Sequence, residues 1–419
     1  MRRNLITWLL YDAGNSFLQT AIGGLYLAQW VVIDNGYPDI WYGATFTIAT
    51  ILVLVLSPLL GAWSDRLGKR MPFIKRLTIL AYLANLGLVL AIISPIPATA
   101  TVLIVLLSYL VVQALYQLSL VSYNSLIDVL STPKTRGKVT GLGEASNNIG
   151  WIIGTAILLP FATGSIILIG TPGRSQVFLP AFLGFLILTL PMLFWFREKP
   201  VTTRRSSSAK EIYTRTLHGL KELFTKHKNL GTFLLGFSFV SDAVITLQLY
   251  FAVAMDRIYA ITDNQKFVLL VIMFVFNIIS SYVLGLFSDK YGKKKVLLTS
   301  CGLLVGTFLV GFLGSNANNL YWIVALAGLA WGGFYVSSRA LLVSLSPKER
   351  LGEYFGLYST FQRFASIIGP LLWGMVTLFL VQYPIFKYRL AGLALIALII
   401  VGTLILKGVR EEEVLGSVA

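Results

Sequence analysis

The chain has 419 residues, of which 56% are hydrophobic and only 12% are charged, and its formal net charge is +16. A soluble domain carries about 25% charged residues, so this composition excludes an ordinary water-soluble protein. Cys301 is the single cysteine, and the two histidines, His218 and His227, share one basic stretch. The sequence therefore excludes an intrachain disulfide and offers no ligand set for a metal ion or another cofactor.

About twelve apolar segments follow one another, each near the roughly 20 residues that a helix needs to cross a bilayer. They cover residues 5–33, 40–64, 73–94, 98–129, 139–161, 177–196, 230–254, 267–288, 296–314, 320–345, 355–381 and 385–407. We expect an all-α membrane protein in which each segment is a transmembrane helix.

Basic residues gather after every second apolar segment. The clusters begin at Arg2, Arg66, Lys134, Lys290 and Lys348, and the long loop at 197–228 is also basic. By the positive-inside rule these loops and both chain termini face the cytoplasm, in what we expect to be the plasma membrane. This placement accounts for the excess charge, so it favours a lipid bilayer over a nucleic acid as the partner.

A charged turn occurs twice. GAWSDRLGKR at Gly61–Arg70 and GLFSDKYGKK at Gly285–Lys294 share the order Gly, three residues, Asp, a cation, one residue, Gly and two cations. A second pair, LSTPKTRGK at 130–138 and LSPKERLGE at 345–353, indicates the same duplication. The expected domains are a six-helix bundle at 1–198, a cytoplasmic linker with an amphipathic helix at 199–228, and a second six-helix bundle at 229–419.

The repeated acid and glycines of this turn predict a cytoplasmic gate. A helix that ends on glycine can approach its neighbour closely, and a carboxylate there can accept hydrogen bonds from the start of a helix in the other half. Asp128 is the acid expected to pair with the basic residues of the first turn. The expected gate residues are Gly61, Asp65, Arg66, Gly68, Arg70, Asp128, Gly285, Asp289, Lys290 and Gly292. The alternative is a solvated turn that only obeys the positive-inside rule, but that rule requires neither the acid nor the glycines.

Polar and ionisable residues inside the apolar segments share helix faces. Such residues are costly in a bilayer and usually face a cavity. The candidate substrate- or ion-binding residues are Asp12, Asn15, Gln19, Gln113, Tyr116, Gln117, Asn124, Glu144, Asn148, Asp242, Tyr335, Arg339 and Arg363. The alternative for each ionisable residue is an internal contact that only holds the bundles together.

Depth in the membrane singles out two of these candidates. At 1.5 Å per residue, Asp242 lies roughly 18 Å and Arg363 about 16 Å from the cytoplasmic ends of their helices. A carboxyl group far from water favours its neutral form, so Asp242 is the first candidate for a proton-coupling or substrate carboxylate. Arg363 is the expected internal cation, either for a substrate carboxylate or for Glu144.

The paired turns resemble the signature of the major facilitator superfamily. WLLYDAGNSF at Trp8–Phe17 is similar to the helix-1 motif of its vacuole-effluxer branch, which is related to the autophagy-linked vacuolar amino-acid exporters of fungi. Further similar stretches lie at Tyr123–Gly154, Ser241–Ala260 and Gly332–Gly374. The branch usually has an aromatic residue before the helix-1 Ala-Asn-Ser, whereas this chain has Ala13-Gly14-Asn15. The resemblance implies two pseudo-symmetric six-helix bundles, a substrate path between them lined chiefly by helices 1, 4, 7 and 10, and alternating access.

The sequence favours a secondary transporter of a small organic solute over an enzyme. It has no Gly-x4-Gly-Lys-Ser/Thr nucleotide loop and no recognisable nucleophile–base pair. Buried acids together with buried arginines favour an amino acid or a similar zwitterion, with coupling to protons as an option, and the resemblance agrees. The alternatives are an exporter of amphipathic organic cations, a sugar carrier and a non-transporting receptor. A monomer is expected because one chain holds both halves.

Overall fold

The computed structural model describes residues 2–132, 135–198, 209–346 and 351–411, and every regular element in these ranges is a helix. The chain divides into two compact units, one comprising Met1–Thr216 with Leu249–Val253 and the other Leu217–Gln248 with Ala254–Ala419. The division falls within α9 (Ala209–Thr225), a helix at the place where the sequence predicts an amphipathic one.

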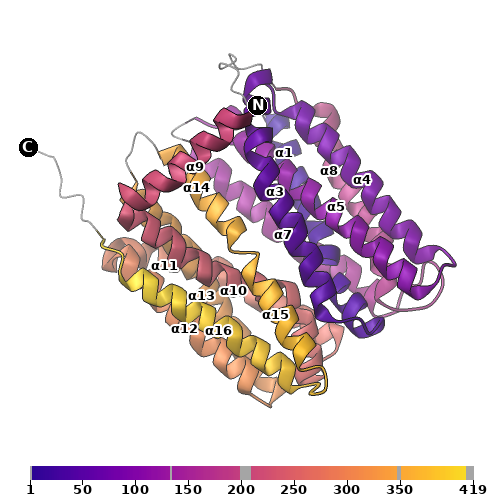
Figure 1. Ribbon diagram of the computed structural model, residues 1–419. Helices are drawn as coiled ribbons and strands as arrows, with labels where there is room; N and C mark the ends of the chain where they lie inside the picture. The colour runs from indigo at the N-terminus through magenta and orange to yellow at the C-terminus, as the bar shows by residue number, and fades with distance from the viewer. Residues whose placement is uncertain (1, 133–134, 199–208, 347–350, 412–419) are drawn as a thin grey trace, which may run out of the picture. The chain divides into compact units, whose positions relative to one another are not determined.

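The first unit is a bundle of long helices, drawn from indigo to magenta in Figure 1. Its elements are α1 (Arg2–Gln19), η1 (Thr20–Gly24), α2 (Tyr26–Gln29), η2 (Trp30–Asp34), α3 (Asp39–Leu67), α4 (Met71–Ile93), α5 (Ala98–Ser125), α6 (Ile127–Leu130), α7 (Arg136–Ala162), η3 (Arg174–Val177) and α8 (Phe178–Trp195). The elements from α1 to η2 form one continuous span with two π-helical stretches. α1 packs against α7 and α8, and α5 packs against α3 and α4.

The second unit repeats this arrangement of long helices (Figure 1). Its elements are α10 (Lys228–Tyr259), α11 (Asp263–Tyr291), α12 (Lys293–Leu313), η4 (Ala317–Asn319), α13 (Leu320–Leu345), α14 (Leu351–Phe364), α15 (Ile368–Phe379) and α16 (Phe386–Lys407). α13 packs against α11 and α12, and α16 packs against α12 and α15.

Eleven helices in the described part of the chain are long and apolar enough to cross a membrane. The twelfth expected span, 355–381, is divided into α14 and α15 (Figure 1). Ser366 Oγ donates to the carbonyl of Arg363 at 3.0 Å and so satisfies the end of α14. Pro370, near the start of α15, has no N–H to continue a helix ladder. The twelve-helix membrane architecture is therefore confirmed, with helix 11 broken.

The charged turns join α3 to α4 and α11 to α12, at what we call the basic end of each unit. Their second glycines, Gly68 and Gly292, have φ of +60° and +98°, a left-handed backbone that favours glycine. The first glycines, Gly61 and Gly285, do not end their helices as expected, because α3 and α11 continue beyond them. A Cβ added at Gly61 would meet no described atom within 4 Å, whereas one added at Gly285 would lie in ordinary contact, 3.5 Å from Val336 Cγ1 of α13.

A buried lysine joins α10 to α11 at the opposite end of the second unit. Lys266 Nζ donates to Asp256 Oδ2 at 2.8 Å and to Asp263 Oδ1 at 3.0 Å, and the lysine side chain is 1% exposed. Thr262 and Gln265 form a capping box at the start of α11, which satisfies backbone donors there. The ion pairs and the cap together fix the turn between the two helices.

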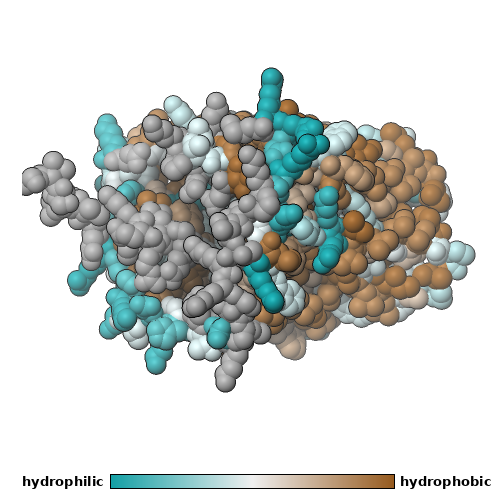
Figure 2. Space-filling view, turned by 90° about the horizontal axis from the view of Figure 1, so that it is seen from above, coloured by the Kyte–Doolittle hydropathy of each residue, from teal (hydrophilic) through white to brown (hydrophobic). Residues whose placement is uncertain are grey.

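Apolar side chains cover the flanks of the bundles. Figure 2, seen from the side on which the N-terminus lies in Figure 1, shows hydrophilic residues on that end and hydrophobic residues on the flank behind it. On α4 the exposed residues Leu83, Leu86, Leu90 and Ile93 recur at helical spacing and share one face. This face is suited to contact with lipid, as the composition predicts.

Candidate functional site

A buried carboxylate lies at the break in helix 11. Asp242 of α10 is 1% exposed, and its Oδ2 accepts a hydrogen bond of 2.8 Å from the backbone N–H of Gly369, in the first turn of α15. The N-terminus of a helix carries partial positive charge, so the broken helix offers a favourable position for an acid. The other oxygen, Oδ1, is buried without a hydrogen-bond partner.

α15 approaches Asp242 so closely that only glycine fits. A Cβ added at Gly369 would lie 2.1 Å from Thr246 Oγ1 and 2.7 Å from Asp242 Oδ1. Thr246 is 0% exposed, and its hydroxyl also has no hydrogen-bond partner. The second unit therefore holds two buried side-chain oxygens, one acid and one hydroxyl, against a helix start.

The first unit makes the corresponding helix contact without an acid. When the repeated Asn-Leu pairs at 4–5 and 229–230 are aligned, Asp242 falls opposite Phe17. In the structure Gly154 of α7 approaches Phe17 and Thr20 of α1, with an added Cβ 3.1 Å from the Phe17 Cα. Close packing of these helices therefore requires a glycine but no carboxylate.

Hydroxyl groups connect α10 to α13 and α14 around this site. Ser241 Oγ and Tyr335 Oη lie 3.1 Å apart, and Ser238 Oγ donates to the carbonyl of Phe361 at 3.2 Å. On the neighbouring helices, Ser338 Oγ and Tyr358 Oη lie 2.9 Å apart. Of the candidates named from the sequence, Tyr335 thus joins the helix that carries Asp242.

Two candidate cations occupy the same unit. Arg363 lies in the last turn of α14, just before the break in helix 11, and is half-buried. Arg339 lies in α13 and is exposed. The sequence predicts that Arg363 lies deeper in the membrane than Arg339, and in the structure Arg363 is also the less exposed of the two.

In the first unit two acids interact across α1 and α7. Glu144 and Asn147 of α7 lie near Asp12 of α1, and Asn147 Nδ2 donates to Ser16 Oγ at 2.7 Å. Asp12 is half-buried and Glu144 is exposed. Sequence reasoning named both acids and expected Arg363 to be the cation either for a substrate carboxylate or for Glu144, which stays a prediction.

The amides of α1 are used in packing inside the first unit. Asn15 Nδ2 donates to the carbonyl of Tyr11 at 2.8 Å, and Gln19 Nε2 donates to Gln113 Oε1 at 3.1 Å. Gln117 Nε2 lies 3.4 Å from Thr50 Oγ1. The Gln19 and Gln117 contacts join α5 to α1 and to α3, whereas the Asn15 bond lies within α1.

The remaining candidates of the first unit are less enclosed. Tyr116 and Asn148 are half-buried, and Asn124 is exposed near the end of α5. Trp8, on the same face of α1 as Asp12, is 2% exposed and stacks on Tyr123 with ring centroids 4.8 Å apart. The tryptophan is therefore a core residue.

The basic ends contain two glutamates that sequence reasoning missed. The Glu198 carboxylate accepts hydrogen bonds of 2.8 Å from the backbone N–H groups of Arg70 and Met71, at the start of α4. In the second unit Glu411 accepts from Lys293 at 2.8 Å and from Lys294 at 3.2 Å, at the start of α12. Each charged turn is thus capped by an acid that follows the last helix of its own unit.

A reciprocal asparagine contact accompanies each cap. Asn4 exchanges two hydrogen bonds with the backbone of Arg197, of 2.8 and 3.2 Å. Asn229 exchanges two with the backbone of Arg410, of 2.6 and 2.8 Å. The signal was present in the sequence, because Asn-Leu opens the first helix of each half and Arg-Glu follows the last.

The expected gate acids Asp65, Asp128 and Asp289 have side chains outside the described part of the structure. Arg66 lies in the last turn of α3 and Lys290 in the last turn of α11. Arg70 is the residue before α4.

Among the described residues no group of three or more His, Cys, Asp or Glu could hold a metal ion.

Comparisons with known proteins agree with this architecture. The sequence matches the Major Facilitator Superfamily at residues 9–260 and again at 232–417. It is 26% identical to the uncharacterized MFS-type transporter YxiO of Bacillus subtilis, over 97% of this chain and 94% of that protein. It is 25% identical to the multidrug resistance protein MdtG of Dickeya zeae, over 90% of this chain and 88% of that protein.

Among solved structures, a mutant of the nucleoside transporter NupG superimposes with a TM-score of 0.75 at 14% sequence identity, covering 97% of this chain and 98% of that one. At this level of identity the likeness concerns the fold. The family match covers nearly the whole chain in two overlapping parts, in keeping with the duplicated bundles. The chain belongs to the Major Facilitator Superfamily, a family of membrane transporters and not of enzymes.

Proposed function

We propose that this transporter couples the movement of a small organic solute to protons, and that Asp242 carries the proton. The observation behind this proposal is the buried Asp242 carboxyl, one oxygen of which is bonded to Gly369 while the other has no hydrogen-bond partner. The absence of an acid at the corresponding Phe17 in the first unit supports a role beyond packing. An ionisable residue inside a membrane span that packing does not require is a functional candidate.

The two oxygens of Asp242 suit a group that alternates between charged and neutral forms. The Gly369 N–H and the α15 dipole stabilise the carboxylate. The Thr246 hydroxyl, the other group that acts on this acid, can donate to the carboxylate, and it can accept a hydrogen from Oδ1 when the acid is neutral. Each form of the acid therefore has a hydrogen-bond partner within the site.

For the cargo we propose an amino acid or a similar zwitterion. The candidate contacts are Asp12 and Glu144 in the first unit and Arg339 and Arg363 in the second, which provide both signs of charge. Membership of the vacuole-effluxer branch is part of this proposal, because that branch is related to amino-acid exporters.

We further propose that the protein is a monomer in the plasma membrane with both termini in the cytoplasm. The distribution of basic residues favours this orientation.

A second candidate cargo is an amphipathic organic cation. The two interacting acids, Asp12 and Glu144, would attract a cation. The relative MdtG is named a multidrug resistance protein. A sugar carrier and a non-transporting receptor have no comparable observation in their favour.

The test is flux into proteoliposomes with and without an imposed pH gradient. Radiolabelled amino acids, sugars and a cationic dye are compared. For a neutral cargo moved with one proton, a gradient of one pH unit can drive about tenfold accumulation. Asp242→Asn is expected to abolish this accumulation and to leave exchange of labelled for unlabelled cargo intact, because only the proton is lost.

Two variants serve as controls. Asp242→Glu keeps a carboxyl and should retain part of the gradient response. Glu222→Gln removes an acid from α9, where Glu222 pairs with the exposed Lys226, and should behave as the unaltered protein. Uptake that ignores the gradient, with Asp242→Asn unchanged, would contradict proton coupling, and a protein that moves no cargo would be a receptor.

A further inference from the structure

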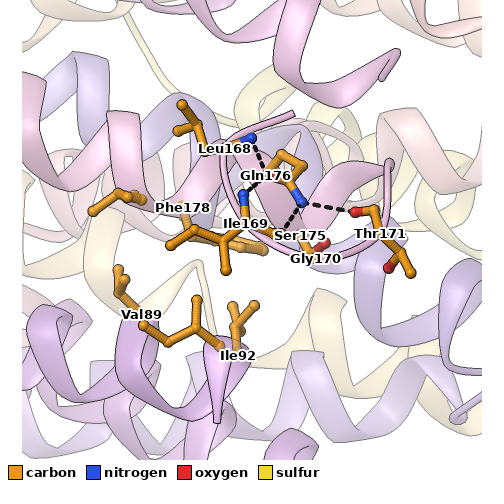
Figure 3. Close-up of a pocket in the computed structure, with 11 residues that line it drawn as sticks. Val89, Ile92, Leu168, Ile169, Gly170, Thr171, Ser175, Gln176 and Phe178 are labelled. Carbon is orange, nitrogen blue, oxygen red and sulfur yellow. Dashed lines mark hydrogen bonds between the residues drawn. The ribbon is translucent and has the colours of Figure 1, made fainter. Parts of the chain in front are cut away.

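A cavity of about 250 Å³ lies in the first unit, at the end opposite to the charged turn (Figure 3). One wall is the last turn of α4, with Val89, Ile92 and Ile93. The other is formed by the loop 168–171 and the start of α8. Since α4 is a candidate membrane span that ends at Ile93, the cavity lies at the edge of the membrane.

A single buried amide holds the loop wall in place. Gln176 is 5% exposed, and its Oε1 accepts from the N–H groups of Leu168 and Ile169 at 2.9 and 3.2 Å. Its Nε2 donates to the carbonyls of Ile169 and Thr171 at 2.5 and 2.7 Å. The close-up shows these bonds drawn from Gln176 to the loop (Figure 3). One wall of the cavity is therefore a loop in which Gln176 satisfies four backbone polar groups.

The same loop exposes a run of apolar side chains. Ile166, Ile167, Leu168 and Ile169 are 43 to 51% exposed. Four consecutive apolar residues at the surface are unfavourable in water and mark an interaction site. At the end of a membrane span, the apolar phase available to them is the hydrocarbon of the bilayer.

The lipid-facing side of α4 leads directly into this cavity. Leu83, Leu86 and Leu90 are exposed on one face, and Ile93, which is 41% exposed, continues that face and lines the cavity. The exposed apolar face of α4 over residues 83–93 is thus continuous with the cavity wall.

We propose that the cavity binds an acyl chain of a bilayer phospholipid. The chain lies between Ile92 of α4 and Ile169 of the loop, and the headgroup lies toward Thr171 and Ser175 at the polar rim. Burial of chain methylenes provides the affinity, and the bonds of Gln176 avoid the cost of ordering the loop on binding. The site is separate from the proposed cargo and proton residues.

The test uses the full chain in nanodiscs with a phospholipid that carries a photoreactive diazirine on its acyl chain. Labelled peptides are located by mass spectrometry. We expect more photolabel per residue in segments 89–93 and 168–179, which line the cavity, than on the rest of the exposed face of α4. Ile92→Trp fills the cavity and should reduce labelling of the loop by about tenfold, because the volume for buried methylenes is lost. Leu83→Trp, on the same face outside the cavity, should leave it unchanged.

Several outcomes would overturn the proposal. Labelling that is uniform along α4, or unaffected by Ile92→Trp, means that the loop touches only bulk lipid. Should Ile92→Trp fail to fold, Ile169→Trp in the exposed loop provides the same test. Unlabelled phospholipid should compete for the site, and stronger competition by a free fatty acid would reject the phospholipid as the ligand.

Discussion

At the scale of single residues, Gly369 has two requirements at the candidate site. Its N–H binds Asp242, and its missing side chain makes room for Thr246 and Asp242. Sequence reasoning selected Asp242 by depth and did not single out this glycine. The glycine belongs to another helix, and no pattern along the chain connects the two positions.

We predict that Gly369→Ala lowers the free energy of unfolding by about 1–3 kcal/mol, because the added Cβ overlaps the Thr246 hydroxyl and forces α15 outward. Gly356→Ala is the matched control, since its added Cβ meets no described atom within 4 Å. Alanine there should be neutral or stabilise α14 by up to about 1 kcal/mol. Denaturation in detergent micelles measures both, and equal effects would contradict the close approach at Gly369.

A second prediction at this scale concerns the buried Lys266. Lys266→Ala removes the buried Nζ that donates to Asp256 and Asp263, and it should lower the free energy of unfolding by about 3 kcal/mol. Lys226→Ala is the control, because its pair with Glu222 lies on the surface and the lysine is 70% exposed. That loss should stay below about 1 kcal/mol. Similar losses for the two variants would mean that the Lys266 pairs contribute little.

At the scale of elements, the caps at the basic ends join the first, third and last long helices of each unit. In the first unit Asn4 holds Arg197 and Glu198 holds the start of α4. In the second, Asn229 and Glu411 do the same for Arg410 and α12. The repetition of these contacts indicates that they belong to the ancestral six-helix unit.

We predict that Glu198→Ala and Glu411→Ala each lower the free energy of unfolding by about 1–2 kcal/mol, since charged caps at helix starts are lost. Glu198→Gln should recover part of the loss, because an amide oxygen still accepts a hydrogen bond. Glu222→Ala on α9 is the surface control. A result in which only one of the two caps matters would show that the repeated contacts are not equivalent.

At the scale of the whole molecule, the repeated acid of the charged turn remains a gate prediction. We expect Asp65→Ala to favour the state that is open at the basic end, because the carboxylate no longer accepts hydrogen bonds from a helix start. The measurement is thiol labelling of single cysteines placed along α5 and α13, in a Cys301→Ser background. Asp65→Glu is the control, and unchanged accessibility in Asp65→Ala would contradict the gate.

Composition and pattern determined the class of this protein. The lengths of the apolar segments predicted the membrane-spanning helices, and the positions of Arg and Lys favoured one orientation in the membrane. The charged turn, which occurs twice, indicated two related halves. These features depend on the solvent and on local geometry, so they can be read along the chain. Even the left-handed Gly68 and Gly292 were visible as a repeated glycine.

Only the tertiary structure decided which partners the polar candidates have. The sequence named Asn15, Gln19 and Gln113 as candidates beside Asp242. In the structure these amides bond to their own helix or to each other, whereas Asp242 binds the start of α15 after the break in helix 11. The caps by Glu198 and Glu411 also required the fold. The physical reason is that hydrogen-bond partners far apart in sequence are brought together by helix packing, and a polar residue shows its role only through its partner.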